Sequence, residues 1–223
     1  MTTRNSEDNA PPLRARLKAA RQAMTPAQRD RGGLLMRARL FTWLGNRRES
    51  LLAKGEAPPR CIAAFWPMPE EPDMRPLMHK WVQESGLTLC LPVVVERDAP
   101  LVFHRWTPAS DMVDGAFGIA RPAHDDPVRP DVILVPTLGF TADGQRLGYG
   151  AGYYDRTLAG LRGQGCEPTT IGLAWANATL PADYRPAPHD QRLDAILTED
   201  GWTPSAPGEP VRAPTRSLFS TRL

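Results

Sequence analysis

A wholly apolar run at residues 132–135, VILV, restricts the fold more than any other stretch of this sequence. It follows a Pro-Asp pair, ends at Pro136, and is mostly β-branched. Such a short run predicts a strand that is buried on both faces, as in the middle of a parallel sheet. After a connection with a turn signal at Asp143-Gly144 comes a glycine-rich segment at 146–156, RLGYGAGYYDR, and then a helical pattern. The order strand, glycine loop, helix indicates an α/β protein.

Five more short apolar runs, separated by turn residues, predict further strands. They lie at 61–65, 87–95, 101–106, 170–174 and 195–197. Residues at helical spacing predict helices near 13–24, 74–84 and 152–162. The alternation of strands and helices predicts a single-domain α/β fold, with a mostly parallel sheet and helices on both faces.

The N-terminal part of the chain predicts two helices in succession. In the first, Arg14, Lys18 and Arg21 recur on one face. The second begins with Thr25 as N-cap and Pro26 at the first helical position, and it runs to about residue 43. The segment 45–59 is interpreted as a loop.

The length of 223 residues suits one domain of this class. Residues 1–12 are polar and end in two prolines, and we expect a disordered N-terminal tail there. Residues 13–202 form the predicted α/β domain. Residues 203–223 are rich in Pro, Ser, Thr and Arg, which predicts a flexible C-terminal tail.

The charge balance is nearly even, with 27 Lys and Arg against 25 Asp and Glu, so we expect no binding to nucleic acid or to an acidic membrane. Three cysteines without CxxC or Cys/His spacing argue against a disulfide scaffold and a structural zinc site. No apolar run approaches the roughly 18 residues of a membrane span. We therefore expect a cytoplasmic protein. For its assembly we expect either a monomer or a weak homodimer.

The glycine loop has the composition of an anion site. Its position predicts that it lies at the carboxyl edge of the sheet, where ligands bind in open α/β folds. Alternate glycines let backbone N–H groups approach an oxyanion, and the following helix N-terminus adds about half a positive charge. Arg146 and Arg156 flank the loop, and Asp155 is a candidate ligand for the Mg²⁺ of a nucleotide.

Two commoner explanations of the glycines fit poorly. Tyr153 stands where a dinucleotide-binding fingerprint needs its third glycine, and the chain contains no P-loop motif. A tight strand-to-helix turn alone would also use these glycines. Such a turn has no need of two arginines, three tyrosines and an aspartate within the same segment.

The segment LVPTLGFTADGQRLGYGAGYYDRTL resembles the signature of 5-formyltetrahydrofolate cyclo-ligases, also called methenyltetrahydrofolate synthetases. Weaker likeness extends from residue 13 to about 200, through LRARLKAARQAM, AAFWPMPEEPDMRPLM and LPADYRPAPHDQRLDAILTED. The resemblance implies a fold like that of the NagB/RpiA/CoA-transferase group, with a reduced folate as substrate and ATP and Mg²⁺ as cofactors. It also implies that ATP phosphorylates the formyl oxygen of 5-formyltetrahydrofolate, that N10 attacks the resulting carbon, and that loss of phosphate leaves 5,10-methenyltetrahydrofolate.

The resemblance implies roles for individual residues. The implied catalytic residues are Arg146, Tyr153 and Asp155, and the implied magnesium ligands are Asp155 and Asp194. The implied ATP-binding residues are Arg14, Arg146, Leu147, Gly148, Tyr149, Gly150, Ala151, Gly152, Tyr153 and Tyr154. The implied folate-binding residues are Trp66, Glu71, Tyr149, Gly150, Gly152 and Tyr153. A carboxylate at position 71 suits a pterin because it can accept hydrogen bonds from the ring amino group and the adjacent N–H together.

The sequence departs from the family pattern at three positions. Ala10 and Ala151 stand where members often have lysine, and Arg121 stands where many have glutamate. Loss of both lysines would weaken ATP binding unless other arginines replace them. Two alternatives therefore stay open: a regulatory protein that binds folate or nucleotide without catalysis, and an isomerase of a phosphorylated sugar on the same fold. The His189-Asp190 pair is interpreted as structural.

Overall fold

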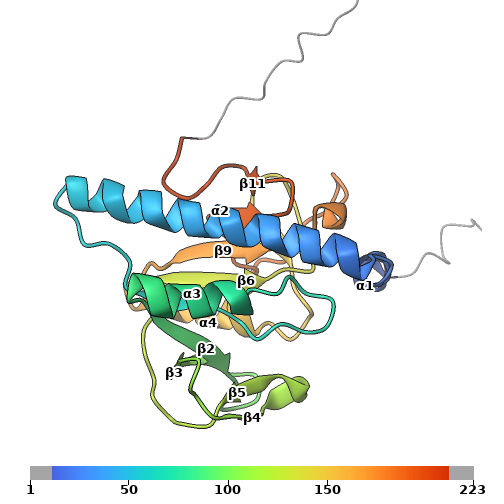
Figure 1. Ribbon diagram of the computed structural model, residues 1–223. Helices are drawn as coiled ribbons and strands as arrows, with labels where there is room; N and C mark the ends of the chain where they lie inside the picture. Colours follow the sequence, from blue (N-terminus) through green and yellow to red (C-terminus); the bar gives the residue numbers. More distant parts are fainter. Residues whose placement is uncertain (1–11, 211–223) are drawn as a thin grey trace, which may run out of the picture.

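The structure is a computed structural model that describes residues 12–210. Seven strands in this part of the chain form one sheet, in the order β11-β10-β9-β6-β1-β2-β3 (Figure 1). Their bounds are β1 Cys61–Ala63, β2 Thr88–Val93, β3 Val102–Trp106, β6 Val132–Pro136, β9 Thr169–Leu173, β10 Ala195–Leu197 and β11 Trp202–Thr203. The five inner strands are parallel, and β3 and β11 pair antiparallel at the two edges. The prediction of a mostly parallel sheet is confirmed, and a strand occurs in each predicted segment.

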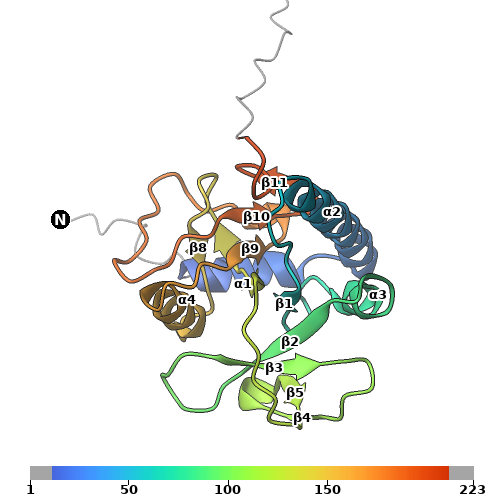
Figure 2. The same cartoon turned by 90° about the vertical axis from the view of Figure 1, so that its left-hand side faces the viewer.

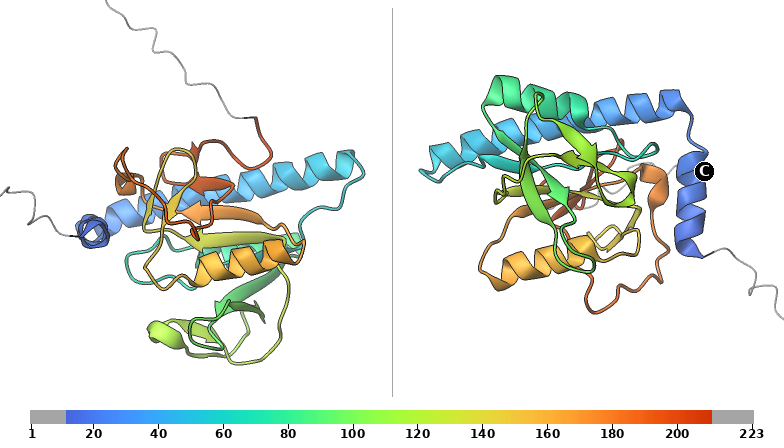
Figure 3. Two further views of the ribbon diagram at one scale, coloured as in Figure 1. Left: turned by 180° about the vertical axis from the view of Figure 1, so that it is seen from behind. Right: turned by 90° about the horizontal axis from the view of Figure 1, so that it is seen from below.

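Helices cover both faces of the sheet, as predicted. Their bounds are α1 Leu13–Gln22, α2 Pro26–Ala53, α3 Arg75–Ser85 and α4 Tyr153–Gly163. Figure 1 shows α2 and α3 in front of the sheet, and the view from behind shows α4 on the opposite face (Figure 3). None of the helices within residues 12–210 combines the length and the apolar character that crossing a membrane requires.

The alternation of side chains along each strand explains the two layers. On the central strand β6, Val132 and Leu134 belong to the cluster that α2 and α3 cover, whereas Ile133 and Val135 belong to the cluster with α1 and α4. All four are buried. A strand that is buried on both faces needs an unbroken apolar run, because successive side chains point to opposite sides.

Two small antiparallel pairs extend from the sheet. One joins β4 (Met112–Asp114) to β5 (Ala120–Pro122) and carries the short helical turn Ala116–Gly118 at its tip. The other joins β7 (Gly139–Phe140) to β8 (Arg146–Leu147) and holds the predicted turn at Asp143-Gly144. In Figure 2 the β4–β5 pair lies beyond the β3 edge of the sheet.

The predicted start of the second helix is confirmed. Thr25 caps α2, its hydroxyl accepts a hydrogen bond from the Gln28 backbone N–H at 3.2 Å, and the Gln28 side chain accepts one from the Thr25 N–H at 2.8 Å. This reciprocal capping box satisfies two N–H groups that a helix start otherwise leaves unpaired.

The predicted loop at 45–59 is wrong over its first part, because α2 continues to Ala53. Gly45 lies exposed in the helix, where glycine costs about 1 kcal/mol relative to alanine. Leu44 and Leu51 are buried on the inner face of the same helix. Burial of two leucines outweighs one glycine, since each contributes roughly 1.5–3 kcal/mol.

The chain beyond residue 202 packs against α2 rather than leaving the domain there. Thr203 pairs in β11, Ala206 is buried, and the indole N–H of Trp43 donates to the Pro207 carbonyl at 3.0 Å. The packed domain therefore continues past residue 202 at least to Pro207. Residues 1–11 and 211–223, which carry the rest of both predicted tails, lie outside the described residues.

Gly172 on β9 provides a test of how tightly the sheet packs. A Cβ at this position would lie 2.5 Å from Ile196 Cδ1 and 2.8 Å from Thr137 Oγ1. We expect Gly172→Ala to lower the free energy of unfolding by about 2 kcal/mol, because the crowded atoms must move. Denaturant unfolding measures the loss. Gly160→Ala in α4, where a Cβ has open space, is the control and should not destabilise the protein; equal losses in both variants would contradict the packing described.

Candidate functional site

A cavity of about 890 Å³ opens at the carboxyl ends of the parallel strands. Phe65, Val93 and Pro136 line it from the ends of β1, β2 and β6. The glycine loop, the start of α4, the segment 66–71, the β4–β5 pair and residues 184–190 complete its wall. The prediction that the glycine loop lies at the carboxyl edge of the sheet is therefore confirmed.

The backbone of the glycine loop uses conformations that suit glycine. Gly150 has φ +106° and Gly152 has φ +67°, a region that residues with a Cβ rarely adopt. Gly152 is also the N-cap of α4, so the first backbone N–H groups of the helix lie at the cavity wall. Free N–H groups at a helix N-terminus favour an anionic ligand.

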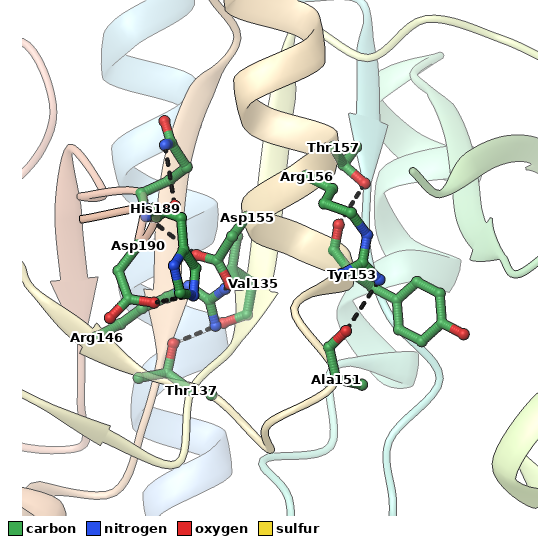
Figure 4. A network of polar contacts seen from close by, with 12 residues as sticks. Val135, Thr137, Arg146, Ala151, Tyr153, Asp155, Arg156, Thr157, His189 and Asp190 are labelled. Atoms are coloured by element: carbon green, nitrogen blue, oxygen red, sulfur yellow. Dashed lines mark hydrogen bonds and ion pairs between the residues drawn. The ribbon is translucent and has the colours of Figure 1, made fainter. Parts of the chain in front are cut away.

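Arg146 and Asp155 form a buried ion pair at the base of this wall (Figure 4). Arg146 Nη2 lies 2.8 Å from Asp155 Oδ2, and their side chains are 4% and 12% exposed. The other carboxylate oxygen, Oδ1, accepts the Gln191 backbone N–H at 3.0 Å. The Arg146 Nε–H is buried without a hydrogen-bond partner among the described residues, so the guanidinium keeps one unused donor.

Two further arginines hold the glycine loop from outside. Arg14 on α1 donates from Nε to the Gly148 carbonyl at 3.0 Å, and Arg156 donates from Nη2 to the Ala151 carbonyl at 2.9 Å. The second contact is drawn in Figure 4. Arg14 is exposed and lines the cavity. Arg14 was predicted to bind the phosphates of ATP, and that role stays a prediction.

Glu71 also lines the cavity, and its carboxyl-bearing side chain is buried. Its Oε1 accepts a hydrogen bond from the Tyr149 hydroxyl, and its Oε2 accepts the Met68 backbone N–H at 2.9 Å. Burial raises the pKa of the Glu71 carboxyl, and the bonds from Tyr149 and Met68 and the charge of Arg21 oppose that rise. Burial also raises the pKa of the Tyr149 hydroxyl, so it stays protonated as a donor.

Arg21 is a member of this group that the sequence did not reveal. It donates from Nη1 to the Tyr149 hydroxyl and from Nη2 to the Thr137 carbonyl at 2.8 Å, and Nη1 lies 3.8 Å from Glu71 Oε1. The spacing of Arg14, Lys18 and Arg21 was the available signal, because it places three cations on one side of α1. Which surface they contact depends on the docking of the helix.

Aromatic rings contact each other at the wall of the cavity. The Tyr153 ring lies 5.9 Å from Phe117 between centroids, at an angle of 67°. Phe117 is 70% exposed and has φ +60°, which is unusual for a residue with a Cβ. Trp66 also lines the cavity and packs edge-on against Trp106. The contact partner Phe117 was missed, because nothing in its local sequence marks it.

Asp194 does not reach the cavity that Asp155 lines. Its Oδ2 accepts the backbone N–H and the hydroxyl of Thr170, both at 2.7 Å, at the start of β9. It instead borders a second hollow of about 450 Å³ with Arg162 and Arg192. The structure therefore does not bring the two predicted magnesium ligands together, because Asp194 precedes its strand whereas the glycine loop follows one.

His189 and Asp190, interpreted as structural from the sequence, both line the cavity. His189 Nε2 lies 3.8 Å from Asp190 Oδ1, and Asp190 Oδ2 accepts the Ala187 N–H at 2.8 Å (Figure 4). Within residues 12–210, no group of three or more His, Cys, Asp or Glu side chains could hold a metal ion. The carboxylates at this cavity are Glu71, Asp155 and Asp190.

The hydroxyl of Tyr154 is buried without a hydrogen-bond partner among the described residues. Burial also raises the pKa of this hydroxyl. An unpaired buried hydroxyl costs about 1–3 kcal/mol, so we expect Tyr154→Phe to raise the free energy of unfolding by about 1 kcal/mol. Denaturant unfolding tests this. The matched Tyr149→Phe removes a bonded hydroxyl and should destabilise; a loss of stability in both variants would show that Tyr154 is bonded after all.

The site thus combines a glycine loop and a helix N-terminus with a buried Arg–Asp pair, at the carboxyl edge of a parallel sheet. This arrangement defines an α/β protein whose site suits a phosphate-bearing ligand. The model of the 5-formyltetrahydrofolate cyclo-ligase family matches residues 6–199. The chain belongs to this family, which is a family of ATP-dependent ligases.

Individual relatives agree with this assignment. The 5-formyltetrahydrofolate cyclo-ligase of Escherichia coli K12 is 30% identical over 168 residues, which cover 71% of this chain and 83% of the relative. That of Mycolicibacterium smegmatis is 33% identical over 151 residues, covering 62% and 73%. The solved structure of Aquifex aeolicus 5,10-methenyltetrahydrofolate synthetase superimposes with a TM-score of 0.67 at 25% identity, over 92% of this chain and 97% of that one. The family resemblance noted in the sequence is confirmed.

Proposed function

We propose that this chain catalyses the ATP-dependent cyclisation of 5-formyltetrahydrofolate to 5,10-methenyltetrahydrofolate, with release of ADP and phosphate. One observation carries the proposal. A single cavity of about 890 Å³ is lined both by the glycine loop with the Arg146–Asp155 pair and by the buried Glu71 with aromatic rings beside it. The reaction needs two ligands side by side, because a phosphoryl group passes from one to the other.

The glycine loop and the start of α4 suit the triphosphate. Backbone N–H groups from Gly152 onward favour negative charge, and Arg14 and Arg146 add guanidinium groups at the same wall. Charge that develops on the transferred phosphoryl group would be stabilised here without reorganisation of the protein.

The part of the cavity around Glu71 suits the reduced folate. A carboxylate at Glu71 can accept from the pterin amino group and its adjacent N–H, while the rings of Trp66 and Tyr153 offer apolar faces to the rest of the ligand. Phosphorylation turns the formyl oxygen into a leaving group. N10 then attacks the formyl carbon, the carbon–oxygen bond breaks, and the phosphate leaves with the N10 proton as hydrogen phosphate while the methenyl bridge closes.

The residues at the cavity fit a magnesium ion that arrives with the nucleotide. Magnesium is usually bound by one or two carboxylates together with phosphates and water. Asp155 would hold it, and Asp190 on the same cavity is a second oxygen donor. When bound, the ion supplies positive charge to the phosphate oxygens. Asp194 stays a predicted ligand that its position beside Thr170 does not support.

The two missing lysines do not leave the loop without cations. Ala10 lies outside the described residues. Ala151 has the guanidinium of Arg156 on its carbonyl at 2.9 Å, and Arg14 bonds to Gly148 on the other side of the loop. These arginines favour an active enzyme over a regulatory protein that has lost catalysis.

A coupled assay tests the proposal. Purified protein with Mg²⁺ and ATP should release ADP only when 5-formyltetrahydrofolate is present, and a near-ultraviolet absorbance of the methenyl product should rise in step. Folded protein that binds folate or nucleotide but releases no ADP would support the regulatory alternative instead. Turnover of a phosphorylated sugar without folate binding would support the isomerase alternative.

The compartment and the assembly are part of the same proposal. We place the protein in the cytoplasm, which is supported by three cysteines without disulfide or zinc spacing. A monomer or weak homodimer stays a prediction, and light scattering over a range of concentrations tests it.

A further inference from the structure

Arg21 is a buried cation that does not line the cavity, although two of its partners, Tyr149 and Glu71, do. It is 5% exposed, and Leu17 and Arg21 are the buried residues of α1. Arginine is rarely buried, because removing its charge from water is costly unless partners replace the solvent. The burial of Arg21 therefore calls for partners that compensate its charge.

The guanidinium connects three segments that are far apart in the sequence. Nη2 donates to the Thr137 carbonyl just after β6, at 2.8 Å, and Nη1 donates to the Tyr149 hydroxyl in the glycine loop. Nη1 also lies 3.8 Å from Glu71 Oε1. The Tyr149 hydroxyl in turn donates to that same carboxylate oxygen. One cation thus fixes the end of a central strand, the nucleotide-side loop and the folate-side carboxylate.

Tyr149 connects the glycine loop, to which it belongs, with Arg21 on α1 and with Glu71. Its ring lies 5.7 Å from the Arg21 guanidinium and 5.9 Å from Lys18 Nζ, measured to the ring centroid. Its hydroxyl accepts a hydrogen bond from Arg21 Nη1 and donates its own proton to Glu71 Oε1. Arg21 has no acceptor atom, so the Tyr149 hydroxyl cannot donate to it and directs its proton to Glu71 instead.

We propose that Arg21 is a positioning residue for folate recognition, which acts through Tyr149 to hold the Glu71 carboxylate ionised and oriented toward the pterin. This inference rests on the proposed function. It adds a residue that touches neither ligand and that the glycine loop motif does not include. The residue sits on α1, whereas the groups it orients belong to two other segments.

The charges around Glu71 determine how its binding should depend on pH. The groups that face it are the Tyr149 hydroxyl, the Met68 N–H, the Arg21 guanidinium and the neighbouring carboxylate of Glu70. Tyr154 lies near as well, as a neutral hydroxyl. Arg21 is the cation in this set, so its removal should raise the pKa of the Glu71 carboxyl further. The pterin would then lose its acceptor at a higher pH than in the unchanged protein.

Calorimetry of 5-formyltetrahydrofolate binding to the full chain between pH 5 and 8 tests the proposal. We expect Arg21→Met to weaken binding at least tenfold at neutral pH and to move the acid loss of binding up by about one pH unit or more. Arg16→Met is the control, since Arg16 is exposed on another face of the same helix. A folded Arg21→Met protein with unchanged affinity and an unchanged pH limb would overturn the proposal.

A second comparison covers the case in which Arg21→Met fails to fold. Arg21→Lys keeps the charge but cannot make the same set of bonds, so it should weaken binding less than tenfold. Adding Arg21→Lys to a Tyr149→Phe variant should cause little further loss of folate affinity, because both changes act on the same contact. Losses that add fully would overturn the proposal. If the unchanged protein binds no folate at all, the proposed function fails instead, so the two failures are distinguishable.

Discussion

Replacement of Asp155 by asparagine is expected to lower kcat by about 10³-fold or more. The carboxylate holds Arg146 at 2.8 Å in a buried pair, and it is the proposed magnesium ligand. The change removes both effects, and loss of one preorganised electrostatic contact alone costs about 10²–10³ in rate. Steady-state measurement of ADP release with both substrates saturating gives the value.

The same variant should also be less stable, which needs a control. An uncompensated buried charge on Arg146 costs about 3–5 kcal/mol, so unfolding must be measured beside kcat. Asp30→Asn is the matched control, because Asp30 is exposed on α2 and away from the cavity. A variant Asp155→Asn that folds and turns over at the normal rate would rule out the assigned role of this pair.

Replacement of Glu71 by glutamine is expected to raise the KM for 5-formyltetrahydrofolate about 100-fold, with little change in the KM for ATP. The amide replaces an acceptor by an N–H₂ donor, which would face the donors of Arg21 and Tyr149. A site built to pair polar groups loses much affinity when one group is left unpaired. Initial rates with each substrate varied in turn separate the two KM values.

The pH dependence gives this prediction a second readout. Because burial raises the pKa of the Glu71 carboxyl above 4.5, folate affinity of the unchanged protein should fall as pH decreases through that raised value. Glutamine does not titrate, so this loss should disappear in Glu71→Gln. Glu70→Gln is the control, since the Glu70 carboxylate is next to Glu71 in the sequence but does not line the cavity. Equal KM changes in the two variants would argue against pterin recognition by Glu71.

The fold was predictable where local signals were strong. Residues 132–135 formed the central strand because an unbroken apolar run can be buried on both faces. Thr25 began α2 because a capping box satisfies its own N–H groups. The extent of α2 was not predictable, because Leu44 and Leu51 stabilise the helix past Gly45 only through residues they bury against in the folded protein.

The candidate site also has a part that was predictable from the sequence and a part that was not. The glycine loop was identified from sequence, since its conformation depends on residues that follow one another. Phe117 and Arg21 were missed as members of the site, because Phe117 reaches Tyr153 from a separate hairpin and Arg21 contacts lining residues that are distant in the sequence, Tyr149 and Glu71. Asp194 was grouped with Asp155 by family pattern, while in the structure it bonds to Thr170 instead.

The sequence by itself determined the class of fold, the glycine loop with Arg146 and Asp155, and the family. These depend on spacing along the chain, on residue conformation and on motifs, all of which are local. Only the tertiary structure decided which side of α1 meets the glycine loop and that Glu71 lies buried against Tyr149 and Arg21. Those contacts join segments separated by up to 134 residues, and their energy comes from burial and pairing that no local pattern encodes.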